Sequence, residues 1–155
     1  MVHFSVERRS PLPLDTAWHR ITCWERHAAH VPLTAITVTT PPPTGAGTRF
    51  VARTGRGPVA FDDPMEVVRW EPPAPGRSGC CLLEKRGRVV RGWARIEVGP
   101  DGAGSRVVWE GDLRVRGVPG LFGPVVARSA RLLYGRVAAG LLREAPPSAG
   151  PAPPR

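Results

Sequence analysis

One polar side chain of the C-terminal segment falls where an apolar one is expected. On a helical projection of residues 122–144, Phe122, Ser129 and Arg136 share a heptad line that runs inside an apolar stripe. Burying an unpaired guanidinium costs several kcal/mol. We therefore expect Arg136 to face the sheet and to be held by a carboxylate, by a ligand anion or by water in a cavity. As a functional residue it would orient a carboxylate, phenolate or carbonyl oxygen of a ligand, with Ser129 hydrogen-bonding beside it. The alternative is an arginine near the cavity mouth whose head group reaches solvent.

A second group of side chains has the residue types that bind zinc, at spacings of four, four and three residues. Its members are His19, Cys23, His27 and His30. On one continuous helix they would share a face, which lies opposite the apolar stripe of Trp18, Ile21 and Trp24. We therefore expect a solvated face, with no metal and no cofactor.

Residues for catalysis are few. The polar candidates to polarise a carbonyl or act as a base are Arg136, Tyr134, Asp112 and His19. Tyr134 is expected off the apolar stripe and Asp112 on an outward strand face. The sequence contains no Ser/His/Asp or Cys/His arrangement and no glycine-rich phosphate loop before a helix. No catalytic residue is assigned, and enzymatic activity stays an open alternative.

The composition is that of one soluble globular domain. The chain has 155 residues, of which 41% are hydrophobic and 23% charged. No segment approaches the roughly 20 apolar residues of a membrane span, and the N-terminus lacks the apolar core of a signal peptide. Three cysteines, two of them adjacent at Cys80 and Cys81, form no disulfide framework. We expect a cytoplasmic protein without integral membrane contact.

The net charge of +9 raises nucleic acid as a partner. However, 21 of the 22 basic residues are arginine, and they are dispersed along the strands rather than gathered in a basic run. Abundant alanine, glycine and proline indicate GC-rich coding as one source of the arginine. We expect solvated strand faces and no nucleic acid. A basic protein that binds nucleic acid or an anionic surface is the remaining alternative.

Periodicity predicts the order of the elements. Residues 3–8 alternate as a strand, and Asp15 is a predicted N-cap for a helical region that Pro32 ends, as one bent helix or two short ones. Turn sequences rich in proline and glycine then separate further short strands, which indicates an antiparallel meander. These strands are expected at residues 34–39, 48–54, 65–70, 80–85, 88–98 and 106–116.

The chain is expected to end in one long helix and a tail. From about residue 122 or 124 to 144 no proline interrupts an apolar stripe formed by Val125, Val126, Leu132, Leu133, Val137 and Leu141. This helix is the only element long enough to cover the apolar face of the sheet. Residues 146–155 are nearly all Pro, Ala, Gly and Ser, so we expect a disordered tail after a domain of residues 1–145.

Four segments resemble START-like proteins of the polyketide cyclase/dehydrase type. They are residues 11–18 (PLPLDTAW), 63–73 (DPMEVVRWEPP), 84–94 (EKRGRVVRGWA) and 105–109 (SRVVW). The resemblance implies an α+β helix-grip fold. In that fold a curved antiparallel sheet of about seven strands wraps around the long C-terminal helix, with a short helical pair after the first strand. It also implies a cavity between sheet and helix, and it leaves the chemistry open because the family includes cyclases, carriers and sensors.

The strand faces allow such a cavity. Large and small side chains alternate on the predicted inner faces, which places space beside aromatic rings. The predicted ligand-binding residues are Phe50, Gly92, Ala94, Ile96, Trp109 and Leu133, together with Ser129 and Arg136. We expect a hydrophobic or aromatic small molecule, bound either by a cyclase-like enzyme or by a carrier or sensor. The alternative is that Trp18, Trp24 and Phe122 fill the gaps.

Overall fold

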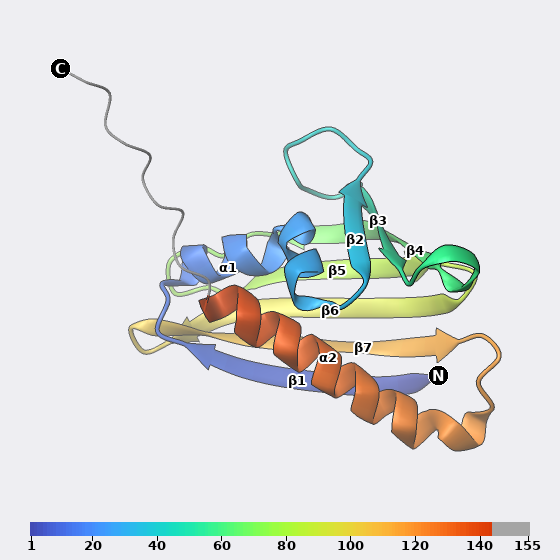
Figure 1. The fold of residues 1–155 in the computed structure, drawn as a ribbon. Helices are drawn as coiled ribbons and strands as arrows, with labels where there is room; N and C mark the ends of the chain where they lie inside the picture. The colour runs from blue at the N-terminus through green and yellow to red at the C-terminus, as the bar shows by residue number, and fades with distance from the viewer. Residues whose placement is uncertain (144–155) are drawn as a thin grey trace.

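The computed structural model describes residues 1–143. Figure 1 shows one sheet with helices on one of its faces. The predicted tail at residues 146–155 lies outside the described residues. The elements in chain order are β1 (Val2–Ser10), α1 (Leu14–Thr22), the 3-10 helix η1 (Trp24–His30), β2 (Thr34–Val38), β3 (Arg49–Thr54), the 3-10 helix η2 (Gly57–Val59), β4 (Phe61–Glu71), β5 (Gly79–Arg86), β6 (Val90–Asp101), β7 (Gly104–Val115), the 3-10 helix η3 (Gly120–Phe122) and α2 (Gly123–Arg143).

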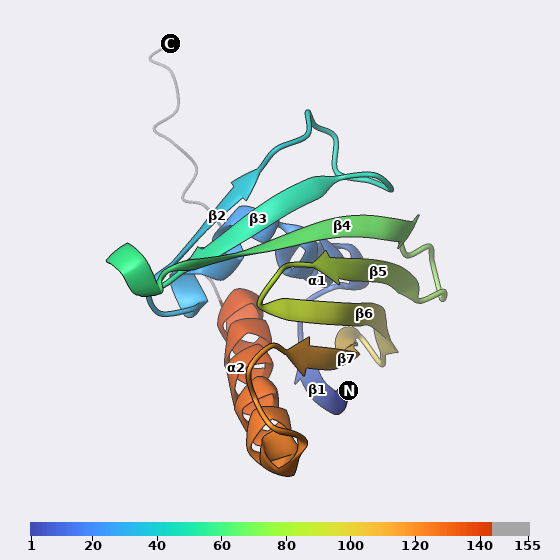
Figure 2. The same cartoon turned by 90° about the vertical axis from the view of Figure 1, so that its right-hand side faces the viewer.

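The seven strands form one antiparallel sheet in the order β1-β7-β6-β5-β4-β3-β2. Strands β2 to β7 form a simple meander. The first strand, β1, lies at the edge of the sheet beside the last strand, β7, and pairs with it along its whole length. The sheet curves around α2, which lies across its inner face (Figures 1 and 2). The predicted helix-grip architecture is therefore confirmed, including the strand number and the long final helix.

The helical region after β1 is two short helices, the second of the two alternatives. Helix α1 ends at Thr22 and η1 begins at Trp24, so Cys23 interrupts the helical spacing. Asp15 is not the N-cap, because the helix already begins at Leu14 after Pro13. Asp15 instead lies in the first turn, where a carboxylate interacts favourably with the helix dipole.

Strand β4 begins at Phe61, four residues before the expected start at residue 65. Pro64 lies within the strand: its register partner is Val51 of β3, and pairing with β5 begins only at Met65. A proline is tolerated at such a place because no ladder hydrogen bond is needed on that side. The extension puts Asp63 on the strand with its side chain directed inward and buried.

The inner faces of β6 and β7 alternate as predicted, and Ala94, Ile96 and Trp109 are buried. Two glycines on these inner faces, Gly92 and Gly111, do more than leave space in the interior. Gly92 has φ = 138°, and a Cβ there would lie 1.9 Å from the carbonyl oxygen of Asp112. Gly111 would likewise bring a Cβ within 2.3 Å of the carbonyl oxygen of Trp93. Close backbone approach between these strands therefore requires both glycines, whatever space they leave inside.

Helix α2 is turned relative to the predicted stripe. Val125 and Leu132 are 62% and 54% exposed, and Ser129 and Arg136 also face solvent. The buried side consists of Ala130, Gly135, Val137, Ala138, Leu141 and Leu142. Most of this buried side is made of small residues, where the helix lies close to its neighbours. A Cβ on Gly135 would lie 2.5 Å from Nη2 of Arg8, and one on Gly140 would lie 2.3 Å from Nδ1 of His30. The expected inward orientation of Arg136 and Ser129 is therefore wrong.

None of the helices within residues 1–143 combines the length and the apolarity that crossing a membrane requires.

Candidate ligand cavity

A cavity of about 110 Å³ lies between the sheet, η1 and the middle of α2. Strands β2 to β7 supply one wall, and the two helices supply the other. Most of its lining is apolar or aromatic, and a polar group stands at one end. The lining residues are Trp24, His27, Val31, Thr34, Ile36, Phe50, Ala52, Thr54, Asp63, Met65, Leu83, Lys85, Ala94, Trp109, Leu133, Tyr134 and Val137.

The structure brings half of the predicted site residues together. Phe50, Ala94, Trp109 and Leu133 line the cavity, as the strand pattern and the helix indicated. Ile96 is fully buried in the core but does not reach the cavity, and Gly92 lies outside the lining as well. Ser129 and Arg136 are on the solvent side of α2 and take no part in this site.

The polar end of the cavity is an ion pair between strands β4 and β5. Nζ of Lys85 donates to Oδ2 of Asp63 at 2.5 Å and lies 3.3 Å from Sδ of Met65. The two charged side chains are only 4% and 12% exposed. Water is therefore largely excluded, and this charge pair is the most strongly desolvated ionic contact in residues 1–143.

Tyr134 of α2 lies against this pair and against two aromatic rings. Its ring stacks on Phe4 with 4.7 Å between centroids and lies 4.8 Å from the ring of Trp109. Burial by itself lowers the pKa of Lys85, but Tyr134 and Asp63 raise it by charge and hydrogen bonding, and the net pKa is raised. Lys85 is therefore an ammonium group that donates hydrogen bonds, not a neutral amine. The expectation that Tyr134 lies off the inner face of α2 is wrong.

Aromatic rings in successive contact form one side of the cavity, which we term the aromatic arc. It runs through Phe50, Trp24, His27, Trp109 and Tyr134, with neighbouring centroids 4.8–5.5 Å apart. Nε1 of Trp24 and of Trp109, and Oδ1 of Asp63, are buried without a hydrogen-bond partner among residues 1–143. Such atoms are costly to bury, so they mark positions where a polar ligand group would stabilise the site.

His27 is buried in the aromatic arc and not on a solvated face. Its Nε2 lies 2.7 Å from the carbonyl oxygen of Ile21, so this nitrogen carries the hydrogen. The helical spacing of His19, Cys23, His27 and His30 did not predict this position, because the helix breaks at Cys23. The break turns His27 inward, while His19 stays exposed. Within residues 1–143 no three His, Cys, Asp or Glu side chains are grouped closely enough to hold a metal ion.

The cysteines offer no nucleophile to the cavity. Cys81 is completely buried, and burial, followed by the neighbouring Cys80, raises its pKa to about 12. Burial also raises the pKa of Cys80. Thiols of this kind are unreactive at neutral pH. Cys81 is a small core residue, whereas Cys80, on the other face of β5, is only half-buried.

Sequence reasoning missed Lys85, Asp63 and His27 as site residues. A usable signal existed for Lys85, which is the only lysine in the chain. It continues the period-two inner face of Cys81 and Leu83, so the pattern places a lysine where an apolar residue is expected. Asp63 stands in the same phase as Met65 and Val67 on β4. The interruption that buries His27 had no comparable signal.

Comparisons with known proteins agree with this architecture. The sequence profile of a family described as "Polyketide cyclase / dehydrase and lipid transport" matches residues 1–145. No curated protein matches the sequence significantly.

Solved structures with the same fold share little sequence. TTHA0849 from Thermus thermophilus has a TM-score of 0.68 and 18% identity, covering 90% of this chain and 94% of its own. The ZhuI aromatase/cyclase from Streptomyces sp. R1128 has a TM-score of 0.60 and 10% identity, with 90% and 92% covered. Ara h 8.0201 has a TM-score of 0.62 and 11% identity, with 92% and 98% covered. The profile match over nearly the whole chain shows that this protein belongs to the polyketide cyclase/dehydrase and lipid transport family.

Proposed function

We propose that the protein binds a small aromatic molecule carrying a hydroxyl or carbonyl oxygen, in the cavity between the sheet and α2. The observation that carries this proposal is the Lys85–Asp63 ion pair with Tyr134 at the end of an otherwise apolar cavity. An apolar cavity with a few convergent polar groups is the usual form of a small-molecule site. Membership of a family that includes lipid transport supports a hydrophobic ligand.

The cavity volume sets the size of the ligand. A volume of about 110 Å³ is below the roughly 300–1,000 Å³ of common ligand pockets and near that of an engineered cavity that holds benzene. One aromatic ring is therefore about the largest group that the cavity accommodates as it stands, and substituents on the ring require small movements of the lining side chains. A larger ring system would have to displace α2 or η1 from the sheet.

The polar groups determine how the ligand is oriented. The Tyr134 hydroxyl and the Lys85 ammonium supply donors at one end, and the indole nitrogens of Trp24 and Trp109 supply further donors along the aromatic arc. Oδ1 of Asp63 can accept from a phenolic hydroxyl. A ligand with one oxygen at the Lys85 end satisfies these groups while its ring contacts the aromatic arc.

The same geometry favours binding over catalysis. Lys85 is charged and already paired, so it is not available as an amine nucleophile, and Oδ2 of Asp63 is already occupied by the hydrogen bond from Lys85. The buried thiol of Cys81 is unreactive. We therefore infer a carrier or sensor rather than a cyclase.

A matched pair of probes tests the proposal: p-cresol, and toluene, which lacks the hydroxyl. Both should perturb the NMR signals of the Trp24 and Trp109 indole N–H groups, and p-cresol should bind more tightly. Tyr134→Phe keeps the stacking ring and removes one hydrogen bond, so p-cresol affinity should fall about three- to tenfold while toluene affinity is unchanged.

Arg136→Leu is the control, because this exposed arginine is on the solvent side of α2. It should leave the affinity for both probes unchanged. Failure of both probes to bind would contradict the proposal. An equal loss of p-cresol and toluene affinity in Tyr134→Phe would contradict the assigned role of the hydroxyl.

A further inference from the structure

Four arginines gather at one end of strands β6 and β7, outside the ligand cavity. Arg88, Arg91, Arg114 and Arg116 are exposed and line a groove of about 470 Å³, which we term the arginine groove. Val89, Val115, Gly117 and Val118 complete its lining. No carboxylate is among these lining residues, so the groove is strongly cationic.

The register of the sheet makes this arrangement costly. Arg91 pairs directly with Arg114, and like charges in facing positions destabilise a sheet. The next pair on the same face is Trp93 and Asp112, and Oδ1 of Asp112 lies 3.2 Å from Nδ1 of His3. The pair after it is Arg95 and Glu110, whose Nη2 and Oε1 atoms form an ion pair at 2.6 Å. None of the four groove arginines forms an ion pair with a carboxylate of residues 1–143. Opposite charges are therefore paired farther along β6 and β7, whereas the arginines of the groove have no such partner among residues 1–143.

Exposed apolar side chains adjoin the arginine groove. Met1 and Leu121 are each 77% exposed, Val125 is 62% exposed, and Phe122 and Val118 are 46% and 41% exposed. A second hollow joins the two sets, because Arg114, Val115 and Val118 line it together with Met1 and Gly120. The apolar residues come from the N-terminus, the loop after β7, η3 and the first turn of α2, at the end of the molecule turned toward the viewer in Figure 2.

We propose that this end of the protein docks on a membrane surface containing anionic lipids. Guanidinium groups match the phosphate oxygens of lipid head groups, and each basic residue near an anionic surface adds affinity. The aliphatic side chains beside them are suited to insert among the acyl chains. Nucleic acid fits this surface less well, because base stacking needs aromatic platforms and Phe122 is the only aromatic ring among the exposed apolar residues of the described chain.

Docking in this orientation would bring the ligand cavity close to the lipid. Lys85 pairs with Gly92 in the register, and the next row outward consists of Arg86 and Arg91, with Arg114 opposite Arg91. The polar end of the cavity is thus one register row from Arg91 and Arg114, on the opposite face of the same end of the sheet. The docking surface is nevertheless distinct from the ligand cavity, and it is tested separately.

Vesicle flotation tests the proposal with two lipid compositions, pure phosphatidylcholine and phosphatidylcholine with about one third phosphatidylglycerol. We expect binding to the anionic vesicles alone at low salt, and its loss in 1 M NaCl, where charges are screened beyond about 3 Å. Arg91→Gln with Arg114→Gln should weaken binding about 25-fold, roughly fivefold for each charge. Leu121→Ser with Phe122→Ser should weaken it about tenfold, because less apolar surface is inserted.

Arg77→Gln with Arg136→Gln is the matched control, since it removes the same charge from exposed positions outside the groove. Its binding should change less than threefold. The Arg91/Arg114 double variant should keep or raise its melting temperature, because it removes two facing like charges. It should also keep its p-cresol affinity, which separates docking from folding and from ligand binding. Equal weakening in the control, or retention of an acidic protein or tRNA without binding to anionic vesicles, would overturn the proposal.

Discussion

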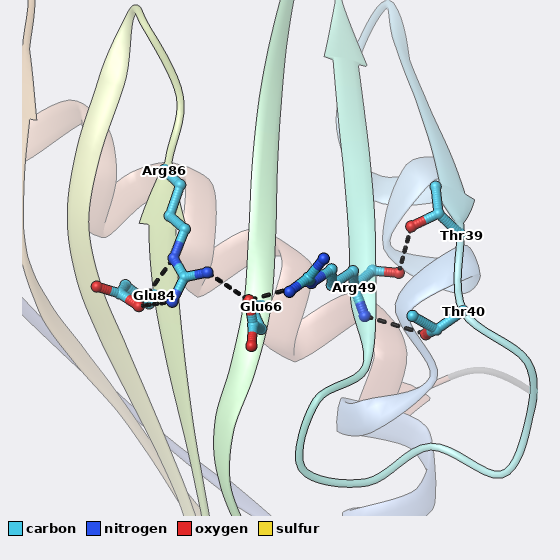
Figure 3. A network of polar contacts seen from close by, with 6 residues as sticks. All are labelled: Thr39, Thr40, Arg49, Glu66, Glu84 and Arg86. Carbon is cyan, nitrogen blue, oxygen red and sulfur yellow. Dashed lines mark hydrogen bonds and ion pairs between the residues drawn. The ribbon is translucent and has the colours of Figure 1, made fainter.

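Two neighbouring residues of β5, Lys85 and Arg86, make the same kind of contact on opposite faces of the sheet. Inside, Lys85 pairs with Asp63 of β4. Outside, Arg86 pairs with Glu66 of β4 and with Glu84, and Glu66 also accepts from Nε of Arg49 at 3.2 Å (Figure 3). The two ion pairs join the same strands but differ in their access to water.

The difference in burial determines what each pair does. The Lys85 and Asp63 side chains are 4% and 12% exposed, whereas that of Arg86 is half exposed. Exposed pairs contribute little, because water and salt compensate for their loss. A buried pair has already lost its hydration, so removing one member leaves the other without compensation. Only the inner pair therefore constrains both stability and ligand chemistry.

The largest effect is expected for Lys85→Met. This variant leaves Asp63 buried and unpaired, and we expect a loss of about 3–5 kcal/mol in the free energy of unfolding, measured by urea denaturation. The double variant Lys85→Met with Asp63→Leu removes both charges and should recover most of that loss. A double variant as unstable as Lys85→Met alone would show that packing of the lysine stem, and not its charge, holds this end of the cavity.

The same pair predicts a loss of stability at alkaline pH. The pKa of Lys85 is raised in the folded protein above its ordinary value of 10.5, so its charged form stabilises the fold below pH 10.5. This contribution is lost as the pH rises through the higher folded value. Urea midpoints measured from pH 9 upward should therefore fall more steeply in the wild type than in the Lys85→Met/Asp63→Leu double variant. Parallel curves would contradict the assignment.

The fold could be predicted because its signals are local. Turn residues separate strands of period two, and each of the predicted strands is present, with β4 extended to Phe61. The family resemblance added the way in which the strands and α2 are arranged, and Phe50, Ala94 and Trp109 followed from the strand pattern. These positions depend only on alternation and on which face is apolar.

The polar end of the site could not be predicted in the same way. Helix α2 buries a face made largely of small residues, and Gly140 lets the ring of His30 in η1 approach closely. A stripe drawn through large apolar residues therefore pointed to Arg136 instead of Tyr134. His27 is buried because the helix breaks at Cys23, and hydrophobic periodicity gives no sign of that break. Contacts between elements, and not propensities within them, placed both residues.

A smaller effect is expected for Glu66→Gln on the outer face. The change removes the negative charge that Arg49 and Arg86 share in Figure 3, but both arginines can return to water. The melting temperature should fall by about 2 °C or less at low salt, and the difference should vanish in 1 M NaCl. A loss as large as that of Lys85→Met would show that the outer network is structurally essential.

The smallest effect is expected for Arg136→Leu, the variant that distinguishes the sequence-based site from the observed one. An arginine inside the cavity would lose ligand affinity when replaced, and one paired with a buried carboxylate would lose stability. The structure places Arg136 on the solvent side of α2, where substitutions rarely change stability by more than about 0.5 kcal/mol. The melting temperature and the p-cresol affinity should both match the wild type, whereas Tyr134→Phe, two residues away, should lower the affinity. Thermal melts and titrations of the two variants side by side test this contrast. A loss of p-cresol affinity in Arg136→Leu with full affinity in Tyr134→Phe would restore the sequence-based site.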